Sequence, residues 1–201
     1  GRRGGGVNPK TESELIFEQF CEDHGLAWRQ IPTDERHTAD YLLGFEGQDI
    51  AIEIKQIERT QGFNPGGYSA RTVGKAVRAR IDSARKQAIT AASVGYPVLL
   101  LIYNAVDPWQ AFGTESHDFL AAMYGELTMQ CGSAGFERVY HGRNAKLQPG
   151  ANNHFSGVGH IWRRQQAVGI TIYENAYATR KLSREQLPNC IEYLSVEFTE
   201  E

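Results

Sequence analysis

The chain has few cysteines and no long apolar run, and both absences limit what it can be. Its three cysteines are odd in number and lack the CxxC spacing of zinc and redox sites, so reduced thiols in a cytoplasmic protein are expected. The apolar run at 98–103 is far shorter than the roughly 20 residues of a membrane span and predicts a buried strand. Residues 1–10 have no apolar signal region and are expected to form a flexible tail. No linker or repeat divides residues 11–201, which favours a single domain. The lack of a long apolar run favours the expectation of no membrane partner.

The chain also lacks a large net charge and several catalytic motifs. The net charge of −3 excludes a histone-like polycation, although it allows an enzyme whose acidic site offsets a basic surface. No GxSxG pattern occurs, and the glycines at 62, 66 and 67 are not followed by the GK[ST] of a phosphate loop. The six histidines show no HxxxH or related spacing. Serine hydrolases, P-loop enzymes and histidine-ligated zinc enzymes are therefore disfavoured.

The segment 50–55, Ile-Ala-Ile-Glu-Ile-Lys, combines an apolar stripe with two charges. In an extended strand the three isoleucines share one face, while Glu53 and Lys55 lie on the other face. Upstream, Asp40 immediately precedes a second apolar run at 41–45, and a Gly-containing turn separates the two runs. Folded as a hairpin, the runs would bring Asp40 beside Glu53 and Lys55.

Two carboxylates and a lysine at one point of a sheet suit metal-dependent phosphodiester hydrolysis. Mg²⁺ prefers oxygen ligands and is usually held by one or two carboxylates plus waters and phosphate. Asp40 and Glu53, with the backbone carbonyl of Ile54, are the expected ligands for Mg²⁺ or Mn²⁺. Lys55 would orient or deprotonate water and offset charge in the transition state. The alternative is an exposed strand face with a simple salt bridge, which contributes little.

The remaining segments predict an α/β fold. Thr11 and Glu14 form a capping-box pattern at the start of a helix that runs to residue 24 and stops at Gly25. A second helix is expected at 72–93, and the order strand, helix, strand favours a sheet with the helix crossing its face. Trp109 and Trp162 are assigned to the core. Further along the chain we expect a short helix at 118–124, strands at 136–140, 158–163, 168–173 and 191–198, and a helical turn or loop at 182–187.

The spacing of Asp40, twelve intervening residues and then Glu53-Ile54-Lys55 resembles the core motif of the PD-(D/E)XK, restriction-endonuclease-like nuclease superfamily. Glu14, about three turns before Gly25, is similar to the helical glutamate of Holliday-junction-resolvase and Mrr-type members, with Glu18 as the fallback. The resemblance covers about residues 11–103. It implies a central mixed sheet flanked by helices, Mg²⁺-dependent cleavage of a nucleic-acid backbone, and catalytic roles for Glu14, Asp40, Glu53 and Lys55.

The sequence also departs from that family pattern. Ala39 stands where a proline usually precedes the aspartate, which removes no ligand. Gln56 follows Lys55 and should point to the opposite face unless the strand bulges.

Gln87, in the second helix, matches a helical glutamine that approaches the site in RecB-like nucleases.

The segment 71–86 is strongly basic, with Asp82 as its one acid, and is expected to contact nucleic-acid phosphates. The expected nucleic-acid-binding residues are Lys75, Arg78, Arg85, Lys86 and Gln87. A solvated helix face is the alternative. Phe63 and Tyr68, in a Gly-rich segment at 60–70 expected to be a mobile loop, could stack on bases.

The sequence therefore predicts a Mg²⁺-dependent endonuclease, with DNA as the favoured substrate. A non-cleaving nucleic-acid-binding module of the same fold, an RNA-directed nuclease or toxin, and an interaction protein with a structural acidic cluster remain the alternatives. Double-strand cleavage would be compatible with a homodimer.

Overall fold

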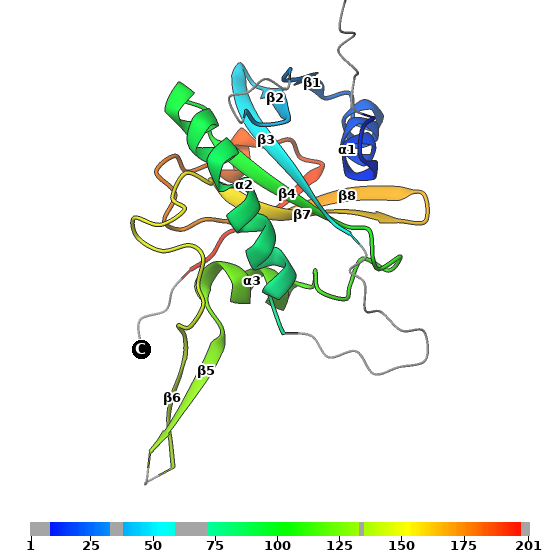
Figure 1. Cartoon of the computed structure of the whole chain (residues 1–201). Coiled ribbons are helices and arrows are strands. Elements are labelled where there is room, and N and C mark those ends of the chain that lie inside the picture. Colours follow the sequence, from blue (N-terminus) through cyan, green and yellow to red (C-terminus); the bar gives the residue numbers. More distant parts are fainter. Residues whose placement is uncertain (1–8, 33–37, 59–71, 133–134, 198–201) are drawn as a thin grey trace, which may run out of the picture.

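Seven strands form one mixed sheet in the order β1-β2-β3-β4-β7-β8-β9 in the computed structural model, which describes residues 9–32, 38–58, 72–132 and 135–197 (Figure 1). Strands β1 to β3 are antiparallel, β3, β4 and β7 are parallel, β8 is antiparallel to β7, and β9 is parallel to β8. The strands are β1 (Ala27–Gln30), β2 (Tyr41–Phe45), β3 (Gln48–Ile57), β4 (Val98–Asn104), β7 (Gly157–Arg164), β8 (Ala167–Glu174) and β9 (Ile191–Leu194).

Helices cover both faces of this sheet. Helix α1 (Glu12–Asp23) packs on one face, and α2 (Lys75–Val94) and α3 (Ser116–Tyr124) pack on the other (Figure 1). The alternation in β3 divides the two cores, because Ile50, Ile52 and Ile54 belong to the α1 side while Ala51 belongs to the α2 side. The predicted α/β class, a central mixed sheet flanked by helices, is confirmed and is consistent with a restriction-endonuclease-like fold.

Local sequence signals explain the elements that frame the site. Thr11 and Glu14 form the predicted capping box at the start of α1. The β2–β3 hairpin turns through Glu46 and Gly47, both at positive φ (47° and 79°), as a two-residue turn of the primed type requires. Three small residues of α2, Ala84, Ala88 and Ala91, are buried and let this helix approach the sheet closely.

The structure corrects several expectations. Trp109 is not core, because its side chain is 78% exposed, and Trp162 is only partly buried. The final strand ends at Leu194 instead of continuing to residue 198. Strand β1 and a strand β5 (Leu127–Gly132) were not predicted, although β5 alternates apolar and polar residues at its start. The expectations for the tail at 1–8, the loop at 60–70 and Arg71 lie outside the described residues.

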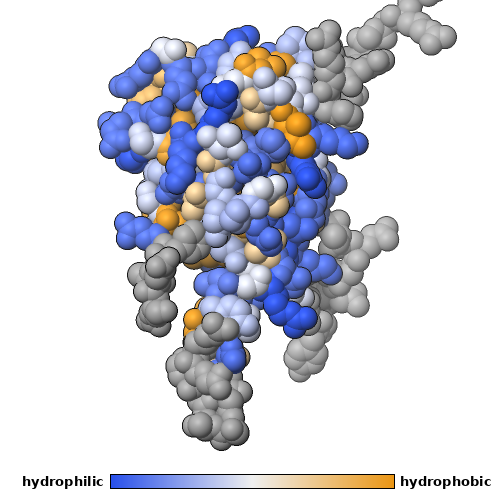
Figure 2. All heavy atoms as spheres, turned by 90° about the vertical axis from the view of Figure 1, so that its left-hand side faces the viewer, coloured by the Kyte–Doolittle hydropathy of each residue, from blue (hydrophilic) through white to orange (hydrophobic). Residues whose placement is uncertain are grey.

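Strands β5 and β6 (Gly135–His141) form a separate two-stranded arm that projects from the body of the molecule (Figure 1). The face seen in Figure 2 is mostly hydrophilic, with small, separate hydrophobic patches. Among the described helices, none is both long and apolar enough to cross a bilayer.

Candidate active site

The β2–β3 hairpin brings Asp40 and Glu53 to neighbouring positions, as the sequence predicts. Tyr41 pairs with Ile52, and the backbone N–H of Asp40 donates to the Ile52 carbonyl at 3.1 Å. The Ile54 N–H donates to Asp40 Oδ2 at 2.7 Å, which fixes the Asp40 carboxylate beside the strand. The hairpin register therefore sets the separation of the two acids without help from any other element.

Glu53 is the most unusual group of the site, because its side chain is only 1% exposed. Lys55 Nζ lies 2.6 Å from Glu53 Oε1, whereas Glu53 Oε2 is buried and has no hydrogen-bond partner among the described residues. Burial and the Asp40 carboxylate together raise the pKa of Glu53 to about 8, although Lys55 acts in the opposite direction. Burial also raises the pKa of Asp40, against the hydrogen bond from Ile54 and the charge of Lys55. The ion pair thus compensates only part of the cost of placing two carboxyl groups here.

These groups fit a hard divalent cation. A buried carboxylate oxygen without a partner calls for an explanation such as a water or an ion. Two adjacent carboxyl groups whose ionised forms repel each other would both be stabilised by a cation. The oxygen-only donor set of Asp40 and Glu53 suits Mg²⁺ or Mn²⁺. The Ile54 carbonyl as a third ligand stays a prediction.

Helix α1 affects this site through the charge of its Glu14 side chain. Glu14 Oε2 accepts hydrogen bonds from the backbone N–H of Thr11 at 2.6 Å and from its hydroxyl at 2.7 Å, so the carboxylate serves the helix cap. Its charge nevertheless raises the pKa of both Asp40 and Glu53. The catalytic role predicted for Glu14 stays a prediction.

Two further residues near α1 have structural partners. Glu18, the fallback for Glu14, accepts from Lys10 at 2.6 Å and from the Tyr41 hydroxyl at 2.7 Å. Gln56 does point to the face opposite Glu53, where its Oε1 accepts from the Ser13 N–H at 3.1 Å and ties the start of α1 to β3.

The basic residues of α2 are not all directed to this site. Arg78 is buried and donates to the carbonyls of Val73 at 2.7 Å and Ala121 at 3.3 Å, so its guanidinium joins α2 to α3. Lys75, Arg85 and Lys86 are exposed. Their contacts with nucleic acid stay predictions.

Gln87 occupies the other flank of α2. It follows Arg78 by nine residues, which is half a turn out of phase in an α-helix, so it lies opposite the flank that meets α3. Helix α3 lies over β7 and β8, because Phe119 packs against His160 and Tyr173. The Gln87 flank therefore faces the β3 side of the sheet. Among the residues described, neither the buried Gln87 Oε1 nor the buried Nε of Arg80, on the same flank, has a hydrogen-bond partner.

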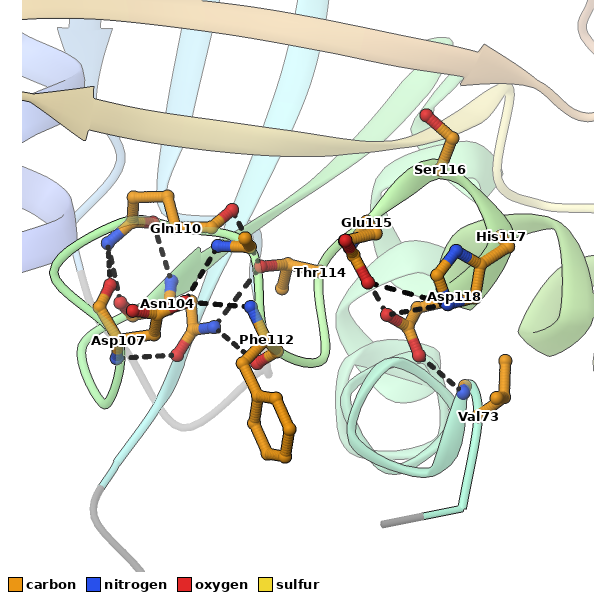
Figure 3. A network of polar contacts seen from close by, with 12 residues as sticks. Val73, Asn104, Asp107, Gln110, Phe112, Thr114, Glu115, Ser116, His117 and Asp118 are labelled. Carbon is orange, nitrogen blue, oxygen red and sulfur yellow. Dashed lines mark hydrogen bonds and ion pairs between the residues drawn. The ribbon is translucent and has the colours of Figure 1, made fainter.

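A second acidic group lies at the start of α3. Ligand atoms of Glu115, His117 and Asp118 lie within 4.8 Å of one another. Asp118 is fully buried and accepts from the backbone N–H groups of Gly74 at 2.9 Å and Glu115 at 3.2 Å (Figure 3). These bonds cap α3 and fasten the start of α2 to it, which explains the cluster as structural.

Comparison with known proteins finds no relative: no protein-family model matches the chain, and no curated protein or solved structure is significantly similar to it.

Proposed function

We propose that the protein is a Mg²⁺-dependent nuclease that hydrolyses phosphodiester bonds, with DNA as the favoured substrate. One observation carries the proposal: Asp40, Glu53 and Lys55 converge on one face of the sheet, and a buried oxygen of Glu53 has no partner in the part of the chain that the structure describes. The fold adds support, because ligands of open α/β sheets bind outside the carboxyl ends of parallel strands, and Lys55 lies near that end of β3.

The residues of the site would divide the work as follows. Asp40 and Glu53 would hold the cation, which supplies polarisation of the phosphoryl oxygen and a lower pKa for bound water. Lys55 would orient the attacking water through its ammonium and offset the negative charge that develops on the phosphate oxygens. Hydrogen-bonding of Asp40 to the Ile54 N–H keeps its carboxylate in place before substrate arrives. Gln87 would donate its amide N–H to a water or phosphate oxygen, as an extra positioning group.

The setting and the substrate extend this proposal. Cys21 and Cys190 carry free thiols, which suit a reducing cytoplasm. DNA is favoured over RNA on the resemblance to PD-(D/E)XK nucleases. Lys75, Arg85 and Lys86 are proposed to attract the phosphate backbone from the exposed side of α2.

The test is cleavage of plasmid, linear and branched DNA, each with Mg²⁺ and with EDTA. The wild type should cleave at least one substrate in Mg²⁺ and none in EDTA. Lys55→Ala should lower the rate by about 10²- to 10⁴-fold, the range of a lost acid–base or charge-stabilising group. Lys181→Ala, at an exposed lysine, is the matched control and should retain full activity. Circular dichroism must show that both variants fold.

Full activity of folded Lys55→Ala, or cleavage that persists in EDTA, would contradict the proposal. Absence of cleavage of every substrate by the wild type would contradict it too.

A further inference from the structure

The segment 105–115 connects β4 to α3 and borders the candidate active site. Asn104, the last residue of β4, pairs with Ile57 of β3, and the Ala105 N–H donates to the Ile57 carbonyl at 3.0 Å. Lys55 lies two residues before Ile57 in β3, which is about 7 Å along a strand. The segment thus leaves the sheet at the carboxyl ends of the strands, where a substrate of the proposed nuclease would approach.

A buried polar network holds this segment in one conformation (Figure 3). Asn104 is 1% exposed; its amide donates to the Phe112 carbonyl at 2.9 Å and the Thr114 hydroxyl at 3.1 Å. Gln110 is 2% exposed at a left-handed φ of 56°, and its amide donates to the carbonyls of Asn104 at 2.6 Å and Asp107 at 3.0 Å. A non-glycine residue is held at positive φ only where its surroundings over-determine it.

Asp107 completes the network from the backbone side. Its carboxylate accepts from the N–H groups of Trp109 at 2.9 Å, Ala111 at 2.9 Å and Phe112 at 2.7 Å. Burial acts to raise the pKa of Asp107, but these three bonds outweigh it and lower that pKa, so the carboxylate stays ionised near neutral pH. The turn at 107–112 is therefore held both by the buried amides of Asn104 and Gln110 and by the Asp107 carboxylate, which makes it rigid.

This rigid turn presents Trp109, whose side chain is 78% exposed, to solvent. An exposed large aromatic on a flexible loop would be unremarkable. On a turn fixed by buried hydrogen bonds, the indole is pre-organised, and binding to it costs little ordering entropy. Rigid, exposed tryptophans are typical of binding surfaces.

A second aromatic feature lies on the other flank of the segment. A cavity of about 460 Å³ is bounded by the segment and by β7, β8 and β9, and Gln110, His160 and Trp162 line it. Arg164 lies over the Trp162 ring, with the guanidinium carbon 5.1 Å from the ring centroid. Lys55 pairs with Ile102 and Ile102 with His160, so this cavity begins two strand spacings, about 10 Å, from the lysine.

We infer that Trp109 is a stacking platform for an unpaired base of the strand being cut, and that the cavity beside Trp162 takes an adjacent nucleotide. This inference rests on the proposed nuclease function and names its substrate class as single-stranded or locally unpaired nucleic acid. The faces of bases inside a duplex are covered by their neighbours, so a protruding indole stacks only on a base that is unpaired. The Arg164 guanidinium, which lies over the Trp162 ring, offers a planar face and a positive charge, which match a base and its phosphate.

The test measures binding by fluorescence anisotropy, in EDTA to prevent turnover, with a labelled single-stranded 15-nucleotide DNA and a fully paired two-strand duplex of the same length, which has no loop. Trp109→Leu, which keeps an apolar side chain but removes the ring, should bind the single strand roughly 5- to 100-fold more weakly, the range of one lost base stack. Its affinity for the duplex should change less than about two-fold. Trp109→Phe should regain most of the loss, and Val94→Ala, at an apolar residue 69% exposed at the end of α2, should have no effect.

Equal single-strand affinity of wild type and folded Trp109→Leu would overturn the inference, and so would an equal loss on the duplex. Either result would leave the proposed nuclease function intact if the wild type still cleaves in Mg²⁺. Conversely, ring-dependent single-strand binding without any Mg²⁺-dependent cleavage would support the stacking platform and contradict the nuclease.

Discussion

Replacing Glu53 by glutamine is expected to remove a large pH dependence from the stability of the metal-free protein. The unfolded chain releases the Glu53 proton near its ordinary pKa of 4.5, whereas burial and Asp40 raise that pKa to about 8 in the folded protein. Between these values the folded state binds one proton more than the unfolded state, so the free energy of unfolding falls as the pH rises. Above pH 8 both states have lost the proton and the loss is complete.

The size of this effect follows from the two pKa values. Each pH unit corresponds to about 1.4 kcal/mol, so a rise from 4.5 to about 8 sets a ceiling of about 5 kcal/mol. This is a large share of the roughly 5–15 kcal/mol that stabilises a typical domain. Glutamine keeps the shape of the protonated acid and cannot ionise. Glu53→Gln should therefore be several kcal/mol more stable than the wild type at pH 8.5 in EDTA, and close to it at pH 5.

Urea denaturation in EDTA, at half-unit steps from pH 5 to pH 9, measures this difference directly. Glu22→Gln, at an exposed carboxylate of α1, is the control and should follow the wild type at every pH. Added Mg²⁺ should stabilise the wild type more at pH 8 than at pH 6, because the cation binds the ionised carboxylate, and should stabilise Glu53→Gln little. Parallel curves for the wild type and Glu53→Gln across pH 5–8 would refute the claim that Glu53 is buried and electrostatically strained.

Three further predictions concern the frame of the site. Burial, followed by the charge of Arg164, lowers the pKa of His160 from 6.5 to about 4. As the pH falls from 6.5 to 4, His160 is therefore protonated in the unfolded chain before it is protonated in the folded protein, and the free energy of unfolding falls by up to about 3 kcal/mol. His160→Gln should not show this loss in acid denaturation. Asp107→Ala should cost about 1–2 kcal/mol and speed amide exchange across 107–112, because three backbone N–H groups lose their acceptor; unchanged exchange would contradict the rigid turn. Leu100→Ala, at a fully buried residue of β4, should cost about 2–5 kcal/mol in urea denaturation, against less than about 1 kcal/mol for Leu15→Ala at a half-exposed position of α1.

Signals within a few residues were enough to predict the elements that carry the acidic site. The capping box of Thr11 and Glu14 is complete within four residues, and the turn at Glu46-Gly47 needs only backbone conformations that its sequence favours. Because strand alternation is strict, those local signals already place Asp40 and Glu53 side by side.

Expectations that needed knowledge of distant partners were less successful. A large apolar side chain such as Trp109 favours a core position, yet apolar residues also make up much of a protein surface, and Trp109 is exposed. The network that presents it joins Asn104, Gln110 and Thr114, whose types are ordinary in a loop and give no signal in the sequence. Strand β1 is mostly exposed at the sheet edge, so it lacks the apolar alternation that marks a strand.

The sequence by itself determined the α/β order of the chain, the hairpin register and the identity of the three groups at its base, since each follows from contacts between residues close along the chain. Only the tertiary structure decided how deeply Glu53 is buried, and with it the raised pKa and the oxygen that has no partner among the described residues, because helix α2, from a later part of the chain, packs on that face and removes water from it. It also decided that Arg78 joins α2 to α3 while Gln87 faces the β3 side, since the phase of a helix against its neighbours depends on packing with residues remote in sequence.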